Sequence, residues 1–598
     1  MQAVILAAGM GRRLGRFTKD STKCMVMVNG QRLIDRLMNQ LELLGLSRVV
    51  VVIGYHGNEL RRHLVKNYGH MPLSFVENRQ FEQTNNIYSL WLTRELLTGD
   101  DTLLLESDLV FDDGLVALAV NAPEPDVVLV SRYLPRMDGT MVTLDDGRIT
   151  SFVERKELDY EHVDRLFKTV NVYKFSREFM TGTYLPFLES YMHTHGMNEY
   201  YEQALAVLTG IDRTDLHPVN VDPMKWYEID DENDLRIAEA IFAAPHKRLE
   251  LLKLAYGGYW RFPEVLDFCY LVNPCFPPDA MVREMKASFG QLLTRYPSGL
   301  AVNSMLMAQL LGVDAGYVCP GNGASELIGS LAAYSGRMGV VCPAFEEYAN
   351  RAGREIEYFF APLPEFGYTA TDLVGFVVDK GLRHLVLINP DNPSGALMAR
   401  SDVIRLAEAC AAHGCRLTVD ESFMGFADSP ESVLANEILE THPNLTVVVS
   451  LSKCYGVPGL RLGAAVSADK DVVECLRREV SIWNINSFAE FFMQIFGKYK
   501  AGYVASQQEF RRLRQELYAG LCGIAGVRVI PSQANYFLCE LPVDAGSIST
   551  ALLDKFGILV KDCTGKRGFG DSRRYIRVAV RSRRDNVYLV EALRGLLS

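Results

Sequence analysis

Short apolar runs of strand type alternate with segments of helical periodicity in the first part of the chain. The strand-like runs occupy residues 3–6, 49–53, 73–77 and 101–108, and helical spacing of apolar residues covers 33–44 and 60–65. Length and period distinguish the two kinds of segment. Because strands that alternate with helices form βαβ units, the pattern predicts an α/β unit with a mostly parallel sheet.

The second half of the chain has apolar runs that each end in a polar motif, at residues 385–388, 416–419 and 445–449. Open α/β sheets bind ligands outside the carboxyl ends of their strands. Lys453 follows the third run, and Ser450, Ser452 and Arg461 supply two hydroxyls and a guanidinium that can hold a phosphate. The combination predicts a pyridoxal phosphate site with Lys453 as the Schiff-base amine. A solvated loop lysine is the alternative.

Three other segments of the second half fit the same cofactor. Asp420 ends a strand-like run, where a carboxylate can pair with the pyridinium nitrogen. Asn392, in Asn-Pro-Asp-Asn-Pro-Ser-Gly, would place its amide on the ring hydroxyl. Ala324 and Ser325 open a helix-like stretch after Gly321, and free backbone N–H groups at such a start hold phosphate. Each segment alone could be an ordinary turn, but together they indicate the cofactor.

These motifs resemble the fold-type I pyridoxal phosphate enzymes of the aminotransferase class I/II family, from about residue 256 to residue 598. The branches most like this chain are threonine-phosphate decarboxylase and histidinol-phosphate aminotransferase. Tyr296 matches the family tyrosine that reaches the cofactor phosphate of the neighbouring subunit, so the resemblance implies a homodimer. It also implies that Arg577 and Arg581 anchor the substrate carboxylate and phosphate, and that Asn486 lies at the substrate.

Several details of the second half favour the decarboxylase branch. Phe423 stands where the aminotransferase usually has tyrosine, and the segments around 457–461 and 575–581 follow the decarboxylase pattern. Leu271 and Phe276 replace an asparagine and a glycine that lie at the substrate in that branch. The resemblance therefore implies a substrate other than threonine phosphate.

The first apolar strand ends in a glycine loop. Backbone N–H groups and arginines in such a loop can hold a triphosphate. The loop and the lysine that follows resemble the signature of nucleotidyltransferases that make nucleoside-diphosphate sugars and CDP-alcohols, although Thr22 replaces the usual proline. The nucleotide-binding residues expected from this resemblance are Leu6, Ala7, Ala8, Gly9, Gly11, Arg12, Lys23 and Asn85. The segment around Asn85 can read a base edge or can simply cap a helix.

Carboxylates follow two strand-like segments of the first half. Asp108 ends one segment, and Glu228 and Asp230 alternate along another, so that they point to the same face. Such oxygen ligands suit Mg²⁺ that also binds phosphate. In the resembled family, acids at these positions hold that metal, and a lysine matching Lys168 lies near the acceptor phosphate. Surface acids and a solvated lysine are the alternatives.

Aromatic residues and acids are spread over residues 133–226. Aromatic faces with carboxylates favour an ammonium group over a hexose. The aromatic residues are Tyr133, Tyr173, Tyr191, Tyr200, Tyr201 and Trp226, and Tyr173 and Tyr201 are expected at the substrate, although most of the set could be core. Residues 1 to about 240 resemble phosphocholine cytidylyltransferases and relatives that act on phosphoethanolamine or 2-aminoethylphosphonate.

Length, charge and cysteine pattern limit the remaining possibilities. A chain of 598 residues is too long for one core, and a break in pattern at 245–255 predicts domains 1–245 and 246–598. The net charge of −11 argues against a nucleic-acid partner. The 12 cysteines lack paired metal spacing, and no apolar run is long enough to span a bilayer. We therefore expect a soluble cytoplasmic protein.

The predicted fold is α/β, with an N-terminal Rossmann-like (GT-A-like) nucleotidyltransferase domain and a C-terminal fold-type I pyridoxal phosphate domain. The leading hypothesis is a bifunctional enzyme. Its C-terminal domain decarboxylates an O-phospho amino acid such as phosphoserine, and its N-terminal domain transfers a cytidylyl group from CTP to the phosphorylated amino alcohol. One alternative makes the second domain an aminotransferase. Another makes one domain a binding or dimerising module.

Overall fold

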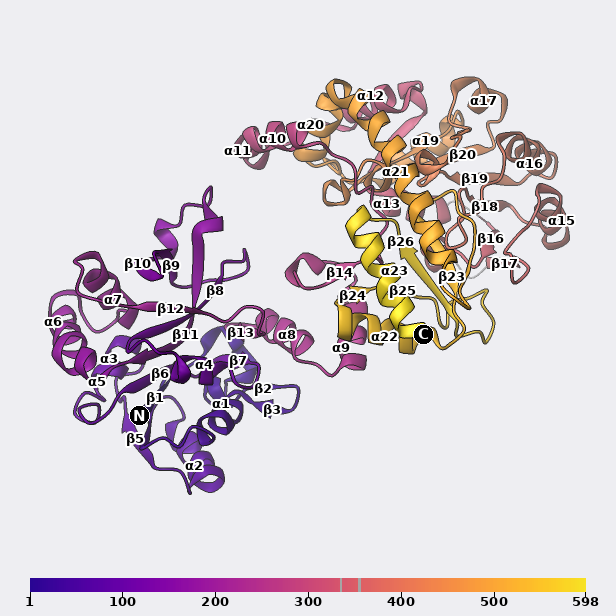
Figure 1. The fold of residues 1–598 in the computed structure, drawn as a ribbon. Helices are drawn as coiled ribbons and strands as arrows, with labels where there is room; N and C mark the ends of the chain where they lie inside the picture. Colours follow the sequence, from indigo (N-terminus) through magenta and orange to yellow (C-terminus); the bar gives the residue numbers. More distant parts are fainter. Residues whose placement is uncertain (334–335, 353–355) are drawn as a thin grey trace. The chain divides into compact units, whose positions relative to one another are not determined.

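A computed structural model describes residues 1–333, 336–352 and 356–598. It divides into two compact units, Met1–Arg261 and Phe262–Ser598 (Figure 1). Helix α9 (Pro245–Ala255), which covers the boundary predicted from the sequence, belongs to the first unit. No helix in the described part of the chain is long and apolar enough to cross a membrane.

The first unit is built on a nine-stranded sheet whose main path runs β10-β9-β11-β6-β1-β4-β5, with β8 and β12 branching from β11. The strands of the whole unit are β1 (Gln2–Ala7), β2 (Met27–Val28), β3 (Gln31–Arg32), β4 (Arg48–Ile53), β5 (Leu73–Glu77), β6 (Thr102–Glu106), β7 (Leu109–Phe111), β8 (Val127–Arg132), β9 (Met141–Asp145), β10 (Arg148–Val153), β11 (Leu166–Phe175), β12 (His217–Asn220) and β13 (Trp226–Glu228). The short pairs β2–β3 and β13–β7 lie outside this sheet.

Helices cover both faces of that sheet. They are α1 (Leu33–Glu42), α2 (Gly57–Tyr68), α3 (Asn86–Trp91), α4 (Leu115–Asn121), α5 (Arg177–Phe179), α6 (Leu185–His195), α7 (Tyr201–Gly210), α8 (Glu232–Ile241) and α9. Successive residues of the buried strand β1 face opposite sides: Ile5 packs with α1, α2 and α4, whereas Val4 packs with α3, α6 and α7. This alternation is the period of a strand covered on both faces.

The strands on which the parallel prediction rested are parallel, and antiparallel pairing enters the sheet with β11. Strands β1, β4, β5 and β6 pair in parallel. Strand β11 then runs antiparallel to β6, β8 and β9. Residues 127–175 contain no α-helix that could carry the chain back over the sheet, and strands joined by short connections pair antiparallel.

The second unit has a seven-stranded sheet of order β15-β21-β20-β19-β18-β16-β17, in which only β21 runs against its neighbours. A smaller sheet has the order β22-β23-β26-β25. The strands of this unit are β14 (Leu266–Asp267), β15 (Val318–Asn322), β16 (Met338–Cys342), β17 (Ile356–Phe360), β18 (His384–Ile388), β19 (Arg416–Asp420), β20 (Leu445–Ser450), β21 (Leu462–Val466), β22 (Arg528–Val529), β23 (Tyr536–Glu540), β24 (Ile558–Leu559), β25 (Lys561–Asp562) and β26 (Tyr575–Ala579).

The helices of the second unit pack on both sheets, as expected from the sequence for a mixed α/β fold. They are α10 (Asp279–Ala287), α11 (Phe289–Thr294), α12 (Leu300–Leu311), α13 (Ala324–Ala333), α14 (Glu347–Arg351), α15 (Ala370–Lys380), α16 (Arg400–Ala412), α17 (Asn436–Thr441), α18 (Leu451–Cys454), α19 (Lys470–Glu479), α20 (Ser487–Ile495), α21 (Lys500–Cys522), α22 (Ala545–Phe556) and α23 (Arg583–Leu597). Two hydrophobic clusters lie on the faces of the large sheet, and a third lies under the small sheet.

Candidate active sites

A cavity of about 1130 Å³ opens at the carboxyl end of β1 in the first unit. The glycine loop after β1 forms one wall, and its Gly11 has a φ of 60°. A Cβ atom at Gly11 would also lie 3.1 Å from Cβ of Lys23. A left-handed backbone and close packing both favour glycine at this position. The predicted glycine loop therefore borders a hollow of a size that can hold a nucleotide.

Seven of the eight predicted nucleotide-binding residues line this cavity: Leu6, Ala8, Gly9, Gly11, Arg12, Lys23 and Asn85. Asn85 also caps α3, because its Oδ1 accepts a hydrogen bond from the backbone N–H of Asn86 at 2.9 Å. The prediction for Ala7 is wrong. Ala7 lies in the core on the opposite face of β1 and is 2% exposed, since alternate residues of a strand point to opposite faces.

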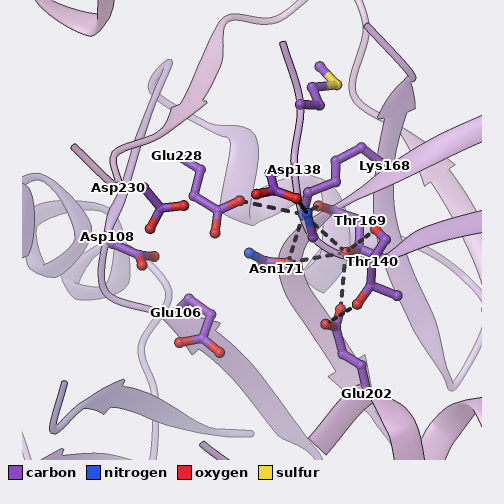
Figure 2. A network of polar contacts seen from close by, with 12 residues as sticks. Glu106, Asp108, Asp138, Thr140, Lys168, Thr169, Asn171, Glu202, Glu228 and Asp230 are labelled. Carbon is purple, nitrogen blue, oxygen red and sulfur yellow. Dashed lines mark hydrogen bonds and ion pairs between the residues drawn. The ribbon is translucent and has the colours of Figure 1, made fainter. Parts of the chain in front are cut away.

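Asp108, Glu228 and Asp230 meet at one side of the cavity, where one oxygen atom of each lies within 4.8 Å of those of the other two (Figure 2). Asp108 follows the end of β6, and Glu228 ends β13, which pairs with β7. Oδ1 of Asp108 is buried and has no hydrogen-bond partner. Three converging carboxylates with an unsatisfied buried oxygen fit a divalent cation such as Mg²⁺.

Two basic side chains already contact these acids. The ammonium of Lys23 lies 2.6 Å from Oδ2 of Asp108 and 2.8 Å from Oδ1 of Asp230. Nη2 of Arg13 lies 2.8 Å from the same Oδ1. Burial alone would lower the pKa of Lys23, but the charges of Asp108 and Asp230 outweigh burial and raise it. Burial would raise the pKa of Asp230, and Lys23 lowers it overall.

One acid of the metal group and one carboxylate near it have raised pKa values. Burial raises the pKa of Glu228 to about 7, although Lys168 opposes the shift. Burial, and then the charge of Asp108, raise the pKa of Glu106, the last residue of β6. Glu106 accepts a hydrogen bond from Nδ2 of Asn86 at 3.0 Å. Sequence reasoning missed Glu106, although it stands two residues before Asp108 in the same strand-like segment.

Lys168 lines the cavity from β11 and is almost fully buried. Its ammonium donates to the carbonyl oxygen of Thr169 at 2.7 Å and to Oδ1 of Asn171 at 3.3 Å, and it lies 3.5 Å from Oε2 of Glu228 (Figure 2). Asn171, which sequence reasoning also missed, has a φ of 58°. Lys168 therefore joins the metal side of the cavity to the far side.

The substrate contacts predicted for Tyr173 and Tyr201 are wrong. Tyr173 is 0% exposed and Tyr201 is 1% exposed, so neither side chain reaches the cavity. The hydroxyl of Tyr173 donates to Glu202, which also accepts from Thr140 at 2.6 Å. The residues that do line this end of the cavity are Asp138, Glu154, Lys156, Tyr160, Tyr200, Glu202 and Gln203. Acids and two aromatic residues line this end of the cavity, at positions other than Tyr173 and Tyr201.

Three predicted cofactor residues of the second unit follow adjacent strands. Asp420 ends β19, Asn392 follows β18, and Lys453 lies in α18, directly after β20. These three strands are neighbours and run in parallel, so their carboxyl ends meet at one edge. Burial lowers the pKa of Lys453 to about 8, and Arg577 and Arg461 add to the effect. A buried amine with a lowered pKa is suited to nucleophilic attack.

Hydrogen bonds fix the groups around Lys453. The hydroxyl of Tyr348 donates to Oδ2 of Asp420 at 3.0 Å, and the backbone N–H of Ser422 donates to Oδ1 at 3.0 Å. Nη1 of Arg577 donates to Oδ1 of Asn392 at 2.7 Å. The Asn392 amide group is thereby left to donate elsewhere, as a contact with a ring hydroxyl would require.

The loop after β15 packs tightly against the segment from β20 to β21. A Cβ atom at Gly323 would lie 2.3 Å from Nη2 of Arg461, and one at Gly463 would lie 2.4 Å from the backbone nitrogen of Ala324. Oγ of Ser452 is buried without a partner. The first positions of α13, which include Ser325, and the nearby buried Ser450 complete this group. These residues fit the phosphate of a bound pyridoxal phosphate.

Three other predicted residues have contacts of a different kind. Tyr296 is 80% exposed and stacks on Trp483 with ring centroids 4.5 Å apart. The Asn486 side chain caps α20 and donates to the carbonyl oxygen of Leu460 at 2.9 Å. Arg581 donates to the carbonyl oxygen of Asp267 at 2.8 Å and pairs with Asp585 at 3.1 Å. Asn486 and Arg581 thus have partners within the protein, whereas Arg577 and Arg461 both act on Lys453.

The fold and the two sites define a two-part enzyme that joins a nucleotidyltransferase unit to a pyridoxal phosphate enzyme unit. The profile of the aminotransferase class I and II family matches residues 266–593, and that of the MobA-like NTP transferase domain matches residues 3–167. The chain therefore belongs to the aminotransferase class I and II family and carries an NTP transferase domain before it. The family resemblances seen in the sequence are confirmed.

Relatives match the whole chain or its second unit. The chain is 33% identical to CMP-5'-(3-aminopropyl)phosphonate synthase of Streptomyces rubellomurinus, over 99% of this chain and 94% of that protein. It is 31% identical to L-serine phosphate decarboxylase of Sulfurospirillum multivorans, over 56% of this chain and 88% of that protein. A solved decarboxylase structure from the same organism superposes on 56% of this chain and 95% of its own length, with a TM-score of 0.50 and 29% identity.

Proposed function

We propose that the protein makes a CMP-activated aminoalkyl phosphonate or phosphate from CTP and a phosphonylated or phosphorylated amino acid. The observation that most supports this proposal is the 33% identity to CMP-5'-(3-aminopropyl)phosphonate synthase, which extends over both units. The cavity with its three converging acids and the buried Lys453 supply a site for each half-reaction. Cytidylyl transfer and decarboxylation are the two reactions that this product requires.

In the first unit, Arg12 and Lys23 bind the triphosphate of CTP. Asp108, Glu228 and Asp230 would hold Mg²⁺, which when bound neutralises charge at the α-phosphate. Lys168 attracts the phosphonate or phosphate oxygen of the acceptor, and its contact with Glu228 at 3.5 Å keeps that cation beside the metal side of the cavity. Acids and Tyr200 at the far end offer partners for the acceptor's ammonium.

In the second unit, Lys453 binds the aldehyde of pyridoxal phosphate, Asp420 faces the ring nitrogen and Asn392 the ring hydroxyl. Ser450, Ser452, Arg461 and the first turn of α13, with Ala324 and Ser325, hold its phosphate. When bound, the cofactor withdraws electrons from the substrate's Cα. Arg577 orients the substrate carboxylate. Tyr348 keeps Asp420 in place through its 3.0 Å hydrogen bond.

The substrate of the second unit is an α-amino acid with a terminal phosphono or phospho group. Loss of CO₂ from 2-amino-4-phosphonobutanoate gives 3-aminopropylphosphonate, the group named in the full-length relative. Phosphoserine is the second candidate, supported by the 31% identity of the second unit to L-serine phosphate decarboxylase. Amino-group exchange with pyruvate or glutamate is the competing reaction, because the family includes aminotransferases.

The second unit acts as a homodimer. Tyr296 is 80% exposed and stacks on Trp483, so its hydroxyl is available to a neighbouring subunit. In α11 and α12, which precede and follow Tyr296 in the chain, Phe289, Leu293 and Met305 are also exposed apolar side chains. A second copy of the chain on this surface would bury them and bring Tyr296 to the partner's cofactor phosphate.

One incubation tests the whole proposal. The protein, CTP, Mg²⁺ and pyridoxal phosphate are mixed with 2-amino-4-phosphonobutanoate or with phosphoserine, and CO₂, pyrophosphate and the mass of the CMP-linked product are followed. We expect CO₂ and pyrophosphate with at least one amino acid, and a CMP-linked amine as product. In a parallel incubation with added pyruvate, transfer of the amino group to pyruvate without release of CO₂ would replace decarboxylation by transamination. If the amino acid does not react but added 3-aminopropylphosphonate supports pyrophosphate release, the second unit is a binding or dimerising module.

A further inference from the structure

Lys23 forms ion pairs with two of the carboxylates that would bind the metal. Its ammonium lies 2.6 Å from Asp108 and 2.8 Å from Asp230, and both residues belong to the group whose ligand oxygens converge within 4.8 Å. Mg²⁺ binds carboxylate oxygens at about 2.1 Å. A metal ion on these carboxylates would therefore compete with the ammonium for the same oxygen atoms and would repel it.

Arg13 adds a second positive charge beside one of these carboxylates. Its Nη2 lies 2.8 Å from Oδ1 of Asp230, which is the oxygen that Lys23 also contacts. The Lys23 ammonium stays charged, because Asp108 and Asp230 raise its pKa against the effect of burial. Without nucleotide, the charges of Asp108 and Asp230 are thus compensated by the protein itself. The electrostatic free energy that a divalent cation gains by binding these two acids is therefore smaller than it would be for two carboxylates without such partners.

The stem of Lys23 also lies against the glycine loop. Its Cβ would be 3.1 Å from a Cβ atom at Gly11, and Arg12, Arg13 and Lys23 all line the same cavity. Rotation about the outer bonds of the side chain can therefore move the ammonium from the acids toward a triphosphate held by that loop. Lys168, by contrast, is held by Thr169 and Asn171 and contacts only Glu228 of the three acids.

We propose that Lys23 is an exchangeable internal counter-ion that disfavours metal binding at Asp108 and Asp230 until a nucleoside triphosphate is bound. This inference rests on the proposed function of the first unit. The triphosphate offers Lys23 a second anion, and when Lys23 moves to it the two acids become available to the metal. Metal and nucleotide then bind with positive coupling, and each raises the affinity of the other by the same factor.

The test measures metal binding rather than turnover. Mn²⁺ is titrated into the nucleotide-free holoenzyme, and free Mn²⁺ is followed by its electron paramagnetic resonance signal. Lys23→Met removes the ammonium and keeps the apolar stem. We expect Lys23→Met to bind Mn²⁺ at least about tenfold more tightly than the wild type, because two charge-assisted contacts no longer have to be broken. Lys23→Arg keeps the charge and should stay within about threefold of the wild type.

Lys156→Met is the matched control. Lys156 lines the same cavity but pairs with Glu154 at 2.8 Å, so its loss removes one charge without freeing a metal ligand. We expect its Mn²⁺ affinity to change by less than about threefold, because a solvent-exposed charge is screened. Addition of Asp108→Asn to Lys23→Met should remove the tight site, which assigns that site to the three acids. Lys23→Gln repeats the test with a neutral polar side chain if the methionine variant does not fold.

Equal Mn²⁺ affinity in the wild type, Lys23→Met and Lys23→Gln, all sensitive to Asp108→Asn, would overturn the counter-ion role and leave the proposed function intact. A Mn²⁺ site that is insensitive to Asp108→Asn, together with no CTP-dependent pyrophosphate release, would instead overturn the proposed metal site and the nucleotidyltransferase activity. An equal increase in affinity in Lys156→Met would attribute the effect to overall charge and would also reject the proposal.

Discussion

Arg577 donates a hydrogen bond from Nη1 to Oδ1 of Asn392 at 2.7 Å, between residues 185 positions apart in the chain. Its Nη2 donates to the carbonyl oxygen of Cys269 at 2.9 Å. Arg577 lies on β26 of the smaller sheet, whereas Asn392 follows β18 of the larger one. This contact links the arginine proposed to anchor the substrate directly to a residue proposed to bind the cofactor.

We expect Arg577→Lys to lower kcat/KM for decarboxylation by about 10- to 100-fold. Lysine keeps the charge but cannot hold Asn392 and a carboxylate at once, and a lost charge-assisted hydrogen bond costs about 1.5–3 kcal/mol. Steady-state kinetics with the amino acid substrate measure the change. Arg574→Lys, at an exposed position of the same arginine-rich stretch, is the control and should remain near the wild-type value.

Lys453→Ala should abolish the visible absorbance of bound pyridoxal phosphate, because the side-chain amine that bonds the cofactor aldehyde is removed. CTP-dependent pyrophosphate release, measured with 3-aminopropylphosphonate supplied as the acceptor, should stay within about twofold of the wild type, since the three acids and the glycine loop belong to a different compact unit. Absorbance spectra and a pyrophosphate assay on the same preparation test both expectations. A coloured Lys453→Ala protein would contradict the assignment.

The rate of cofactor uptake by the apoenzyme should rise with pH and level off near pH 8. Burial lowers the pKa of Lys453 to about 8, and only the neutral amine attacks an aldehyde. Below pH 8 the neutral fraction therefore falls by up to about tenfold per pH unit. Stopped-flow absorbance after addition of pyridoxal phosphate measures the rate. A rate that continues to climb up to pH 10 would indicate a lysine with its ordinary pKa.

Asp108→Asn should reduce CTP-dependent pyrophosphate release by at least about 100-fold. The substitution removes a charged ligand from the group of converging carboxylates, and a metal-bound transition state is stabilised by several kcal/mol. Decarboxylation should be retained. Asp113→Asn, at an exposed acid close by in sequence, provides the control. Equal loss of both reactions would show that the change had damaged the whole protein.

Metal affinity of the first unit should fall as the pH drops below about 7. Burial raises the pKa of Glu228 to about 7, so below this pH the carboxylate is protonated and must release its proton before it binds a cation. The dissociation constant for Mn²⁺ should therefore increase by up to about tenfold per pH unit. Titrations at pH 6 and pH 8 measure this difference, and Glu228→Gln should bind weakly at both values with a flatter dependence.

The local pattern of apolar and polar residues was enough to predict the strands that position the sites. The apolar runs correctly placed β4, β5, β18, β19 and β20 within a few residues, because each is a buried strand bounded by polar loops. The antiparallel pairing of β11 was not predicted, because it depends on how segments far apart in the chain meet. The predicted position of Lys453 after a strand is correct because that relation is local.

Side-chain direction explains the errors within the first site. Ala7 stands between Leu6 and Ala8 in the chain, but it points to the other face of the sheet and into the core. Tyr173 and Tyr201 lie in segments that do border the cavity, yet their rings pack inward. Composition can indicate an aromatic and acidic region, whereas the face that each ring takes depends on tertiary packing.

The junction between β20 and α18 has a further consequence. β20 ends at Ser450 and Lys453 follows within the first turn of α18, so the direction of its amine depends on the number of residues between them. One inserted or deleted residue there would rotate the amine by about 100° around the helix axis. Natural chains that keep this chemistry should therefore show no change in the length of this segment.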